Sequence, residues 1–375
     1  MASTNIGGSR LPAPVKRGED WVVLGGTANR LWERGYFGRP IRDGIQLTAA
    51  EVLNAHRLRG MPLPYDGWLA DTLTSNPNLL FEAEVLGALR YPGEKVILSQ
   101  NIASANAVLL DEDSWALRWP RDVKPSETEP VAEVRWMRAR DAIDWEVLAR
   151  WTSNVESGGR IPEILIVDDE HGVVTYRCKH HNPRGEQKNP FNDLDNDARR
   201  KVAHAWSSGH ETSGGYWLNI QSGEWPITGS GINLEDGVWI DHLEARAVSR
   251  IVNPTMLRPE GVEGTLLHIL EDLLSRGLTI RPGFKYGTRW RAYDGLVGDG
   301  HAPWLIVPIH EAPTDWAEAC LSARLSAGVN KKWLCALPST KTQSPSDSRP
   351  GSGGWRFLAL ERPPSDARWT NPIKH

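Results

Sequence analysis

Four side chains in the last third of the chain, Tyr286, Tyr293, His301 and Lys331, could take part in acid–base or electrostatic chemistry. A histidine titrates close to neutrality and can move a proton, and a lysine carries a compact positive charge that suits an anion. A tyrosine has an unperturbed pKa of about 10 and would need a nearby cation to act as a base. Each residue alone is weak evidence, because a histidine in a glycine turn or a lysine at a strand start is usually a solvated surface residue.

Metal and cofactor chemistry has little support in the spacing of the residues. His180 and His181 stand side by side without further spaced ligands, and the sequence contains no His-Glu-x-x-His or Cys-x-x-Cys motif. The cysteines Cys178, Cys320 and Cys335 are too few and too scattered for a disulfide framework or a zinc site. We therefore expect buried thiols, no metal and no organic cofactor.

The composition limits the class of protein. The chain has 375 residues, of which 40% are hydrophobic and 24% charged, with a formal net charge of −4. These values exclude collagen-like and wholly disordered chains and allow several hydrophobic cores. Lys and Arg number 43 against 47 Asp and Glu, so any contact with nucleic acid must be local. Without a signal sequence or a run of about 18 apolar residues, we expect a soluble cytoplasmic protein.

Short strands and capped helices must position the candidate side chains. The run Gly-Ile-Gln-Leu at 44–47 predicts a strand, and Thr48 with Glu51 forms a capping-box pattern before a helix that Gly60 ends. The run Gly-Ile-Asn-Leu at 231–234 resembles the run at 44–47 and again precedes a predicted helix. The recurrence half a chain apart indicates an internal duplication.

Further matches support the duplication. Residues 29–36 resemble residues 203–210, and Asp-Trp pairs at 144–145 and 315–316 each open a predicted helix that lies between strand-like runs. We expect an α/β (α+β) fold of two tandem units, each with a small α+β domain followed by an α/β domain around a mixed central sheet. The predicted segments are a flexible tail (1–20), α+β and α/β domains of unit 1 (21–77, 78–180), a linker (181–200), and α+β and α/β domains of unit 2 (201–260, 261–375), with a disordered loop at 338–354.

The ordered set of motifs between residues 262 and 337 is more specific than any one of them. The set consists of Asp272-Leu273, Arg276-Gly277, Gly283-Phe284-Lys285-Tyr286-Gly287, Arg291-Ala292-Tyr293, His301 before an apolar strand, Arg324 on a predicted helix, and Lys331-Lys332 opening the next strand. In this order and at these spacings, it resembles the catalytic domain of the archaeal tRNA-splicing endonucleases (tRNA-intron lyases).

The resemblance implies a nuclease-like domain at 261–375 and a triad of Tyr293, His301 and Lys331. The family's pattern favours Tyr293 over Tyr286, because the catalytic tyrosine ends the strand after the glycine-rich motif. In this reading the 2′-hydroxyl of RNA attacks the adjacent phosphate, with Tyr293 as general base, His301 as general acid and Lys331 stabilising the phosphorane. The expected products carry a 2′,3′-cyclic phosphate and a 5′-hydroxyl.

The resemblance also implies an RNA clamp in which two arginines stack on a bulged base. Arg324 matches the first arginine. Arg356 and Arg362 both remain candidates for the second, because the insertion at 338–354 blurs the register.

The first half retains the fold pattern without the triad. Trp119, Glu129 and Arg160 align roughly with Tyr293, His301 and Lys331, and a tryptophan cannot serve as a base. Residues 78–180 are therefore predicted to form a degenerate, non-catalytic copy of the nuclease-like domain.

We expect cleavage of precursor tRNA at bulge–helix–bulge junctions by a homodimer, since one branch of the family fuses two units in each chain. The resemblance assigns the acidic turn Asp168, Asp169 and Glu170 to assembly, although an ordinary solvated turn fits these residues equally well. Two alternatives remain open. The chain could be a non-catalytic structural subunit of such an enzyme, or a metal-dependent nuclease with a restriction-endonuclease-like core.

Overall fold

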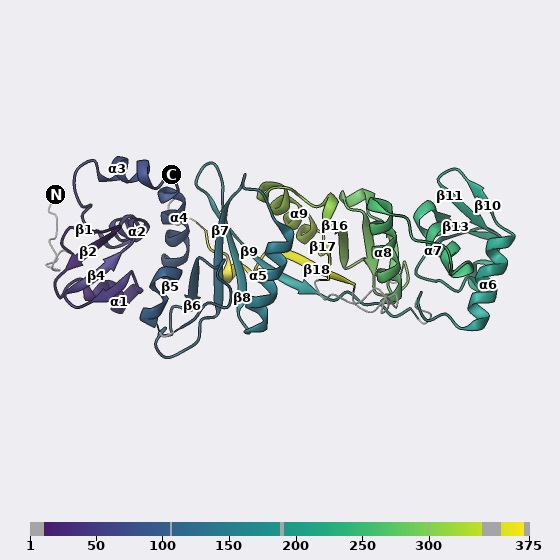
Figure 1. The fold of residues 1–375 in the computed structure, drawn as a ribbon, viewed down its shortest axis with the longest axis horizontal. Helices are drawn as coiled ribbons and strands as arrows, with labels where there is room; N and C mark the ends of the chain where they lie inside the picture. Colours follow the sequence, from purple (N-terminus) through teal and green to yellow (C-terminus); the bar gives the residue numbers. More distant parts are fainter. Residues whose placement is uncertain (1–10, 106, 188–190, 299, 340–353, 371–375) are drawn as a thin grey trace. The chain divides into compact units, whose positions relative to one another are not determined.

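The chain forms two compact units. The computed structural model describes residues 11–105, 107–187, 191–298, 300–339 and 354–370 (Figure 1). The first unit comprises Met1–Lys179, Thr314–Glu318 and Arg362–His375, and the second comprises His180–Pro313 and Ala319–Glu361. Within the described residues, each unit contains a small α+β domain and an α/β domain, so the predicted mixed fold is confirmed. No helix of the described ranges is long and apolar enough to cross a membrane.

The first α+β domain contains an antiparallel sheet of order β1-β2-β4-β3. Its elements are β1 (Val15–Arg17), β2 (Asp20–Leu24), α1 (Asn29–Gly35), β3 (Arg39–Ile41), β4 (Gly44–Leu47), α2 (Ala49–Arg59) and α3 (Trp68–Ser75). The predicted capping box is confirmed, because Thr48 Oγ1 accepts the N–H of Glu51 at 3.1 Å and Glu51 Oε2 accepts that of Thr48 at 3.3 Å. Gly60 ends α2 in the left-handed region with φ 65°, where a residue without Cβ is favoured.

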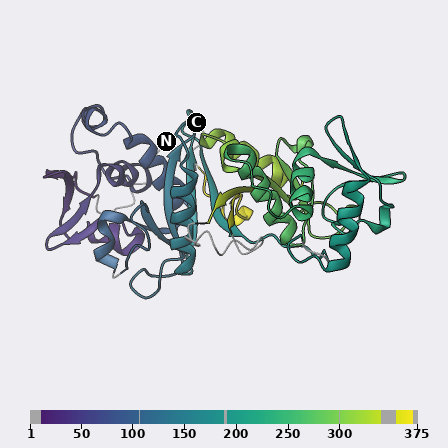
Figure 2. The same cartoon turned by 45° about the vertical axis from the view of Figure 1, so that its right-hand side comes forward.

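The first α/β domain follows directly. Its elements are α4 (Leu79–Arg90), β5 (Lys95–Leu98), η1 (Ser99–Ala105), β6 (Ala116–Trp119), β7 (Ala132–Arg138), α5 (Trp145–Ser157), β8 (Ile161–Val167) and β9 (Val173–His181). The strands lie in the order β5-β6-β7-β8-β9, with β7 parallel to β8 and the other neighbours antiparallel. The parallel pair needs a crossover, which α5 supplies. Both α4 and α5 flank the strands (Figures 1 and 2).

The second α+β domain has the corresponding sheet, β10-β11-β13-β12, again antiparallel. Its elements are α6 (Asn196–Ser207), β10 (His210–Thr212), β11 (Gly215–Leu218), η2 (Ser222–Glu224), β12 (Ile232–Leu234), β13 (Gly237–Asp241) and α7 (His242–Val252). A capping box opens α7, because Asp241 Oδ1 accepts the N–H of Glu244 at 2.8 Å and Glu244 Oε2 accepts that of Asp241 at 3.0 Å.

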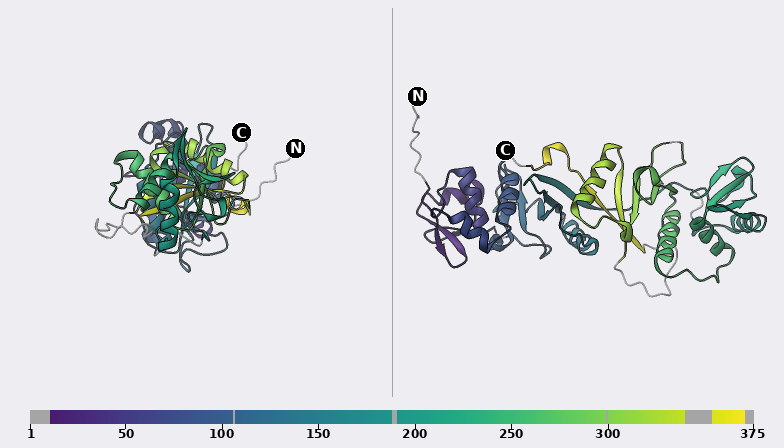
Figure 3. Two further views of the ribbon diagram at one scale, coloured as in Figure 1. Left: turned by 90° about the vertical axis from the view of Figure 1, so that its right-hand side faces the viewer. Right: turned by 90° about the horizontal axis from the view of Figure 1, so that it is seen from above.

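The second α/β domain repeats the strand order of the first. Its elements are α8 (Gly261–Ser275), β14 (Thr279–Pro282), η3 (Phe284–Tyr286), β15 (Trp290–Tyr293), β16 (Trp304–Pro308), η4 (Ile309–Glu311), α9 (Trp316–Gly328), β17 (Lys332–Pro338) and β18 (Trp355–Glu361). The pair β16–β17 is parallel, and the other neighbours are antiparallel. The helix α8 flanks these strands (Figures 1 and 3). Leucines of α8 share a hydrophobic core with one face of the sheet. The helix contributes Leu267, Leu270 and Leu274, and the sheet contributes Ala292, Ile306 and Leu334.

The sheet order corrects the internal match made from sequence. By position in the two four-stranded sheets, β12 corresponds to β3 and β13 to β4. The run at 231–234 therefore corresponds to β3, and its likeness to the run at 44–47 is misleading. Likewise α1 lies between β2 and β3 in the chain, whereas α6 precedes β10, the first strand of its sheet in the chain. Short apolar runs recur by chance, whereas hydrogen-bonded strand order is specific.

Two segments differ in detail from expectation, and most of a third lies outside the described residues. Residues 15–17, expected in a loose tail, form β1 and pair with β2. The helix α6 begins at Asn196, inside the expected linker, because Asp195 Oδ1 accepts the N–H of Ala198 at 2.7 Å as a helix cap. Of the expected disordered loop at 338–354, residues 340–353 lie outside the described residues.

Candidate active site

Three neighbouring strands of the second α/β domain bring the predicted triad to one edge of the sheet. Ala292, Trp304 and Lys332 form one row across β15, β16 and β17, and the N–H of Lys332 donates to the Pro303 carbonyl at 2.9 Å. One step beyond this row, and on the opposite face, come Tyr293, Pro303 and Lys331. Two strand spacings therefore separate the tyrosine and lysine backbones, about 10 Å. Two side chains of this length can both reach a phosphate placed between them.

The lysine is the most enclosed member of the triad. Lys331 is 8% exposed, and its Nζ donates to the carbonyl oxygen of Ala302 at 2.7 Å. His301 is exposed and directly precedes Ala302 in the chain. The ring centroid of Tyr286 lies 5.5 Å from the Lys331 Nζ. The ammonium group is thus held by the backbone carbonyl of the residue that follows His301 in the chain.

Two arginines surround the candidate base Tyr293, which is 7% exposed. The guanidinium carbon of Arg291 lies 5.8 Å from its ring centroid. Burial lowers the pKa of Arg281, and electrostatic interaction with Glu244 and Tyr293 partly opposes this effect. Arg281 also donates to the carbonyl of Ile280 at 2.6 Å. A phenolate formed at this position would therefore face positive charge.

Glu244 lies in the second α+β domain and interacts electrostatically with Arg281. Burial, followed by repulsion from Asp241, raises the pKa of Glu244 to about 7. Its carboxylate accepts the N–H of Gly231 at 2.9 Å as well as that of Asp241. Glu244 therefore has a structural role at the start of α7.

The predicted RNA-binding arginines occupy different places. Arg324 is exposed on α9. Arg356 is half-buried and pairs with Leu337, which lies six residues from Lys331 and so roughly 20 Å away along the strand. Arg362 is exposed and directly follows Glu361, the residue that binds Lys332 at 3.0 Å. Strand register thus favours Arg362 over Arg356.

The acidic turn lies between β8 and β9 in the first unit. Asp168 Oδ1 accepts the N–H groups of Glu170 at 3.0 Å and Gly172 at 2.6 Å. Asp169 and Glu170 are exposed, and Asp169 lies 3.6 Å from the exposed Arg140. Asp168 therefore shapes the turn, which leaves Asp169 and Glu170 as its outward charges.

Several motif residues build the scaffold. Asp272 Oδ2 accepts a hydrogen bond from Arg276 Nε at 2.6 Å, and Arg276 Nη2 donates to the Trp355 carbonyl at 3.0 Å. Burial raises the pKa of Asp272, and the charge of Arg276 opposes this shift. Gly277 has a φ of 74° and lies against Gly185, where a Cβ on Gly185 would clash with the Gly277 carbonyl.

Sequence reasoning missed the role of the segment before residue 188, which was expected to be a linker. The N–H of Glu186 donates to the Asp294 carbonyl at 2.7 Å, immediately after Tyr293. Gln187 Nε2 donates to Thr279 Oγ1 at 2.7 Å, and this hydroxyl donates to the Gly295 carbonyl at 2.9 Å. The supposed linker therefore fixes the end of the tyrosine's strand. Its polar, turn-rich composition contains no signal for this role.

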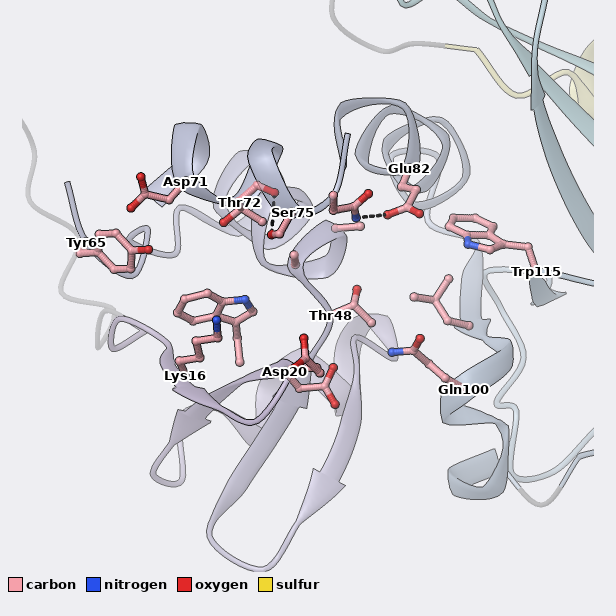
Figure 4. Close-up of a pocket in the computed structure, with 16 residues that line it drawn as sticks. Lys16, Asp20, Thr48, Tyr65, Asp71, Thr72, Ser75, Glu82, Gln100 and Trp115 are labelled. Carbon is pink, nitrogen blue, oxygen red and sulfur yellow. Dashed lines mark hydrogen bonds between the residues drawn. The ribbon is translucent and has the colours of Figure 1, made fainter. Parts of the chain in front are cut away.

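A cavity of about 400 Å³ in the first unit offers a different environment (Figure 4). Its lining includes the carboxylates of Glu19, Asp20, Asp71 and Glu82 together with Lys16. This excess of negative charge disfavours a phosphate, so the cavity is a poor site for RNA.

No group of three potential metal ligands gathers among the residues that the structure describes. Asp299, two residues before His301 in the chain, lies outside them. The expected absence of a metal therefore stays a prediction.

Comparisons with known proteins identify the same part of the chain. Residues 265–344, which include Tyr293, His301 and Lys331, match the family model of the tRNA intron endonuclease, catalytic C-terminal domain. The tRNA-splicing endonucleases of Methanosarcina acetivorans and Methanosarcina mazei are each 22% identical to this chain over 85% of its length and 93% of theirs. That of Thermoplasma volcanium is 38% identical over 77 residues, 20% of this chain and 26% of that protein. The resemblance to the archaeal tRNA-splicing endonucleases is therefore confirmed, at low identity over most of the chain and most specifically in the catalytic domain.

Proposed function

We propose that this chain is a tRNA-splicing endonuclease that cuts precursor tRNA at the bulge–helix–bulge junctions of its introns. The convergence of Tyr293, His301 and Lys331 at one sheet edge supports this function. The match to the family model of the catalytic C-terminal domain, over residues 265–344, covers the same residues. A substrate of this kind implies a cytoplasmic enzyme.

The proposed reaction is an internal transesterification. Tyr293 takes the proton of the 2′-hydroxyl, whose oxygen attacks the adjacent phosphorus and forms a pentacoordinate phosphorane. The bond from phosphorus to the 5′ oxygen then breaks, and His301 gives its proton to this leaving oxygen. Lys331 stabilises the extra negative charge of the phosphorane. The products carry a 2′,3′-cyclic phosphate and a 5′-hydroxyl, and the step as written needs no metal or organic cofactor.

Substrate contacts in this proposal come from two arginines. Arg324 and Arg362 are each proposed to stack on an unpaired base, a contact that unpaired RNA bases favour. Replacing either with alanine is expected to raise KM more than it lowers kcat, because a stacking contact to a base binds the substrate without touching the reacting phosphate.

Cleavage of a bulge–helix–bulge RNA in EDTA tests the proposal. The full chain should cut the RNA and leave cyclic-phosphate ends. Lys331→Ala should lower the cleavage rate by about 10²–10³-fold and leave a measurable residual rate, whereas the neighbouring Lys332→Ala, which loses the ion pair to Glu361, should retain the wild-type rate. Binding without cutting would indicate a structural subunit. Activity lost in EDTA, or a 3′-hydroxyl product, would indicate a metal-dependent nuclease.

We further propose that the enzyme works as a homodimer, because two splice junctions need two triads and the second α/β domain supplies one per chain. The exposed Asp169 and Glu170 are the proposed assembly contacts of the acidic turn. Charge reversal at both positions should lower the mass measured by light scattering to that of one chain. A wild-type chain that is a stable monomer would contradict this assembly.

A further inference from the structure

The surroundings of Lys331 include an aromatic side chain that the triad does not use. The ring of Tyr286 lies within cation–π range of the ammonium, with 5.5 Å between Nζ and the ring centroid. On another side, Nζ donates to the Ala302 carbonyl at 2.7 Å. Tyr286 is 38% exposed, so its ring borders solvent at the mouth of the site.

A closed turn fixes the position of this ring. The N–H of Tyr286 donates to the Gly283 carbonyl at 2.8 Å, and that of Gly283 donates to the Arg289 carbonyl at 3.0 Å. A Cβ on Gly283 would clash with Thr288, and Gly287 ends the turn in the left-handed region with φ 64°. The glycines of the Gly-Phe-Lys-Tyr-Gly motif are thus required by the backbone, and together they fix where the tyrosine stands.

An aromatic ring holds a cation in a way that suits catalysis. A lysine side chain has many rotamers and must lose this freedom before its charge can stabilise a transition state. A carboxylate would fix the ammonium but would also neutralise it. A ring attracts the cation without a negative charge, and one carbonyl occupies one of the three N–H donors. The remaining donors can then serve a phosphate.

We propose that Tyr286 is a positioning residue that holds the Lys331 ammonium toward the scissile phosphate while leaving its charge available. This inference rests on the proposed function. The tyrosine's hydroxyl has no part in it, which separates this role from that of a general base.

Two substitutions at one position test the role. Tyr286→Phe keeps the ring and should cleave within twofold of the wild-type rate. Tyr286→Leu removes the ring at similar size and should lower the single-turnover rate about threefold to thirtyfold, with KM unchanged. Phe284→Leu, on the same turn with a 91% exposed side chain, is the matched control and should leave the rate unchanged. Circular dichroism and melting temperature verify that each variant folds.

A double-mutant cycle separates positioning from a general structural effect. In a Lys331→Ala background, Tyr286→Leu should produce no further loss of the residual rate. An equal loss in both backgrounds would overturn the proposal, as would a change in KM alone. A loss of more than a hundredfold in Tyr286→Phe would instead identify Tyr286 as the base. A wild-type chain that does not cut the RNA would contradict the proposed function itself.

Discussion

The two α/β domains share a strand order and, among their described strands, a single parallel pair, yet their corresponding edges differ in charge. Continuing the strand registers from each domain gives matched positions, with Trp119 at Tyr293, Glu129 at His301 and Arg160 at Lys331. This agrees with the rough alignment made from sequence. The same backbone therefore carries two different sets of side chains at one edge.

The cation of the first domain is neutralised. Arg160 Nη1 binds Glu133 at 2.7 Å and Nη2 binds Glu129 at 2.9 Å, while Nη1 also donates to the Val108 carbonyl. In the second domain, Lys331 has a carbonyl and a ring as its neighbours. A positive charge can stabilise a phosphorane only where carboxylates have not already compensated it. The comparison shows how one fold can hold a structural cation or an available one.

The interiors of the two domains differ in charge as well. Arg118, which corresponds to Ala292, is buried and binds Glu163 at 2.6 Å and Glu94 at 2.7 Å. Burial opposes the charge of Arg118, but the two carboxylates together raise its pKa. Glu163 in turn corresponds to Leu334. The first domain thus has an ion network where the second has an apolar core.

The largest effect expected from this comparison is on activity. His301→Ala should lower the cleavage rate by about 10²–10⁴-fold, because the leaving oxygen loses its acid. The matched change Glu129→Ala, in the first domain, should leave the rate unchanged. Single-turnover cleavage of a bulge–helix–bulge RNA measures both. Comparable losses from the two variants would show that the first domain also takes part in the chemistry.

The next effect is on stability. Arg118→Ala leaves the buried Glu163 without its main partner and should lower the free energy of unfolding by about 3–5 kcal/mol. Arg121→Ala, which breaks an exposed pair with Asp122 at 3.3 Å, is the control and should cost less than about 1 kcal/mol. Urea unfolding followed by tryptophan fluorescence measures the difference. Similar midpoints for the two variants would contradict a structural role for the network.

A smaller effect depends on pH and belongs to the second domain. The hydrogen bond from His181 at 2.7 Å and, after it, Lys332 lower the pKa of Glu361 to about 2. A carboxyl group whose pKa is lower in the folded state than in the unfolded state stabilises the fold at pH values above its unfolded-state pKa. This stabilisation is lost as the pH falls toward 2. Between pH 5 and 2 the loss should reach about 2 kcal/mol, allowing for solvent screening.

Glu361→Gln should therefore unfold with a shallower dependence on acid than the wild type. Its register counterpart in the first domain is Lys179, which has no carboxyl group to titrate in this range. Urea titrations at several pH values measure the slope. Parallel slopes for wild type and variant would rule out the ion pair as the cause.

The smallest expected effect is on stability, when one of the two carboxylates that neutralise Arg160 is removed. The Glu129 side chain is 79% exposed, so Glu129→Ala should change the free energy of unfolding by less than about 1 kcal/mol. Replacing Glu133, whose side chain is fully buried against the same arginine, with alanine should lower the free energy of unfolding by more. Melting curves of the two variants compare them directly. A larger loss from Glu129→Ala would reverse this ranking.

The sequence by itself determined features that depend on near neighbours. The capping pattern of Thr48 and Glu51 fixed the start of α2, and the Asp-Trp pairs fixed α5 and α9, where Asp144 and Asp315 accept backbone N–H groups of the first turn. These signals act within one helical turn, so they can be read without knowing the fold. The ordered motifs likewise identified the catalytic domain and its three candidate residues.

Only the tertiary structure decided which distant residues meet. It placed Tyr286 over Lys331, set residues 185–187 against the end of the tyrosine's strand, and favoured Arg362 over Arg356. It also replaced the apparent match of residues 44–47 with 231–234 by a correspondence of strands. The physical reason is that strand pairing joins residues far apart in the chain, and a shift of one residue moves every side chain to the other face of the sheet.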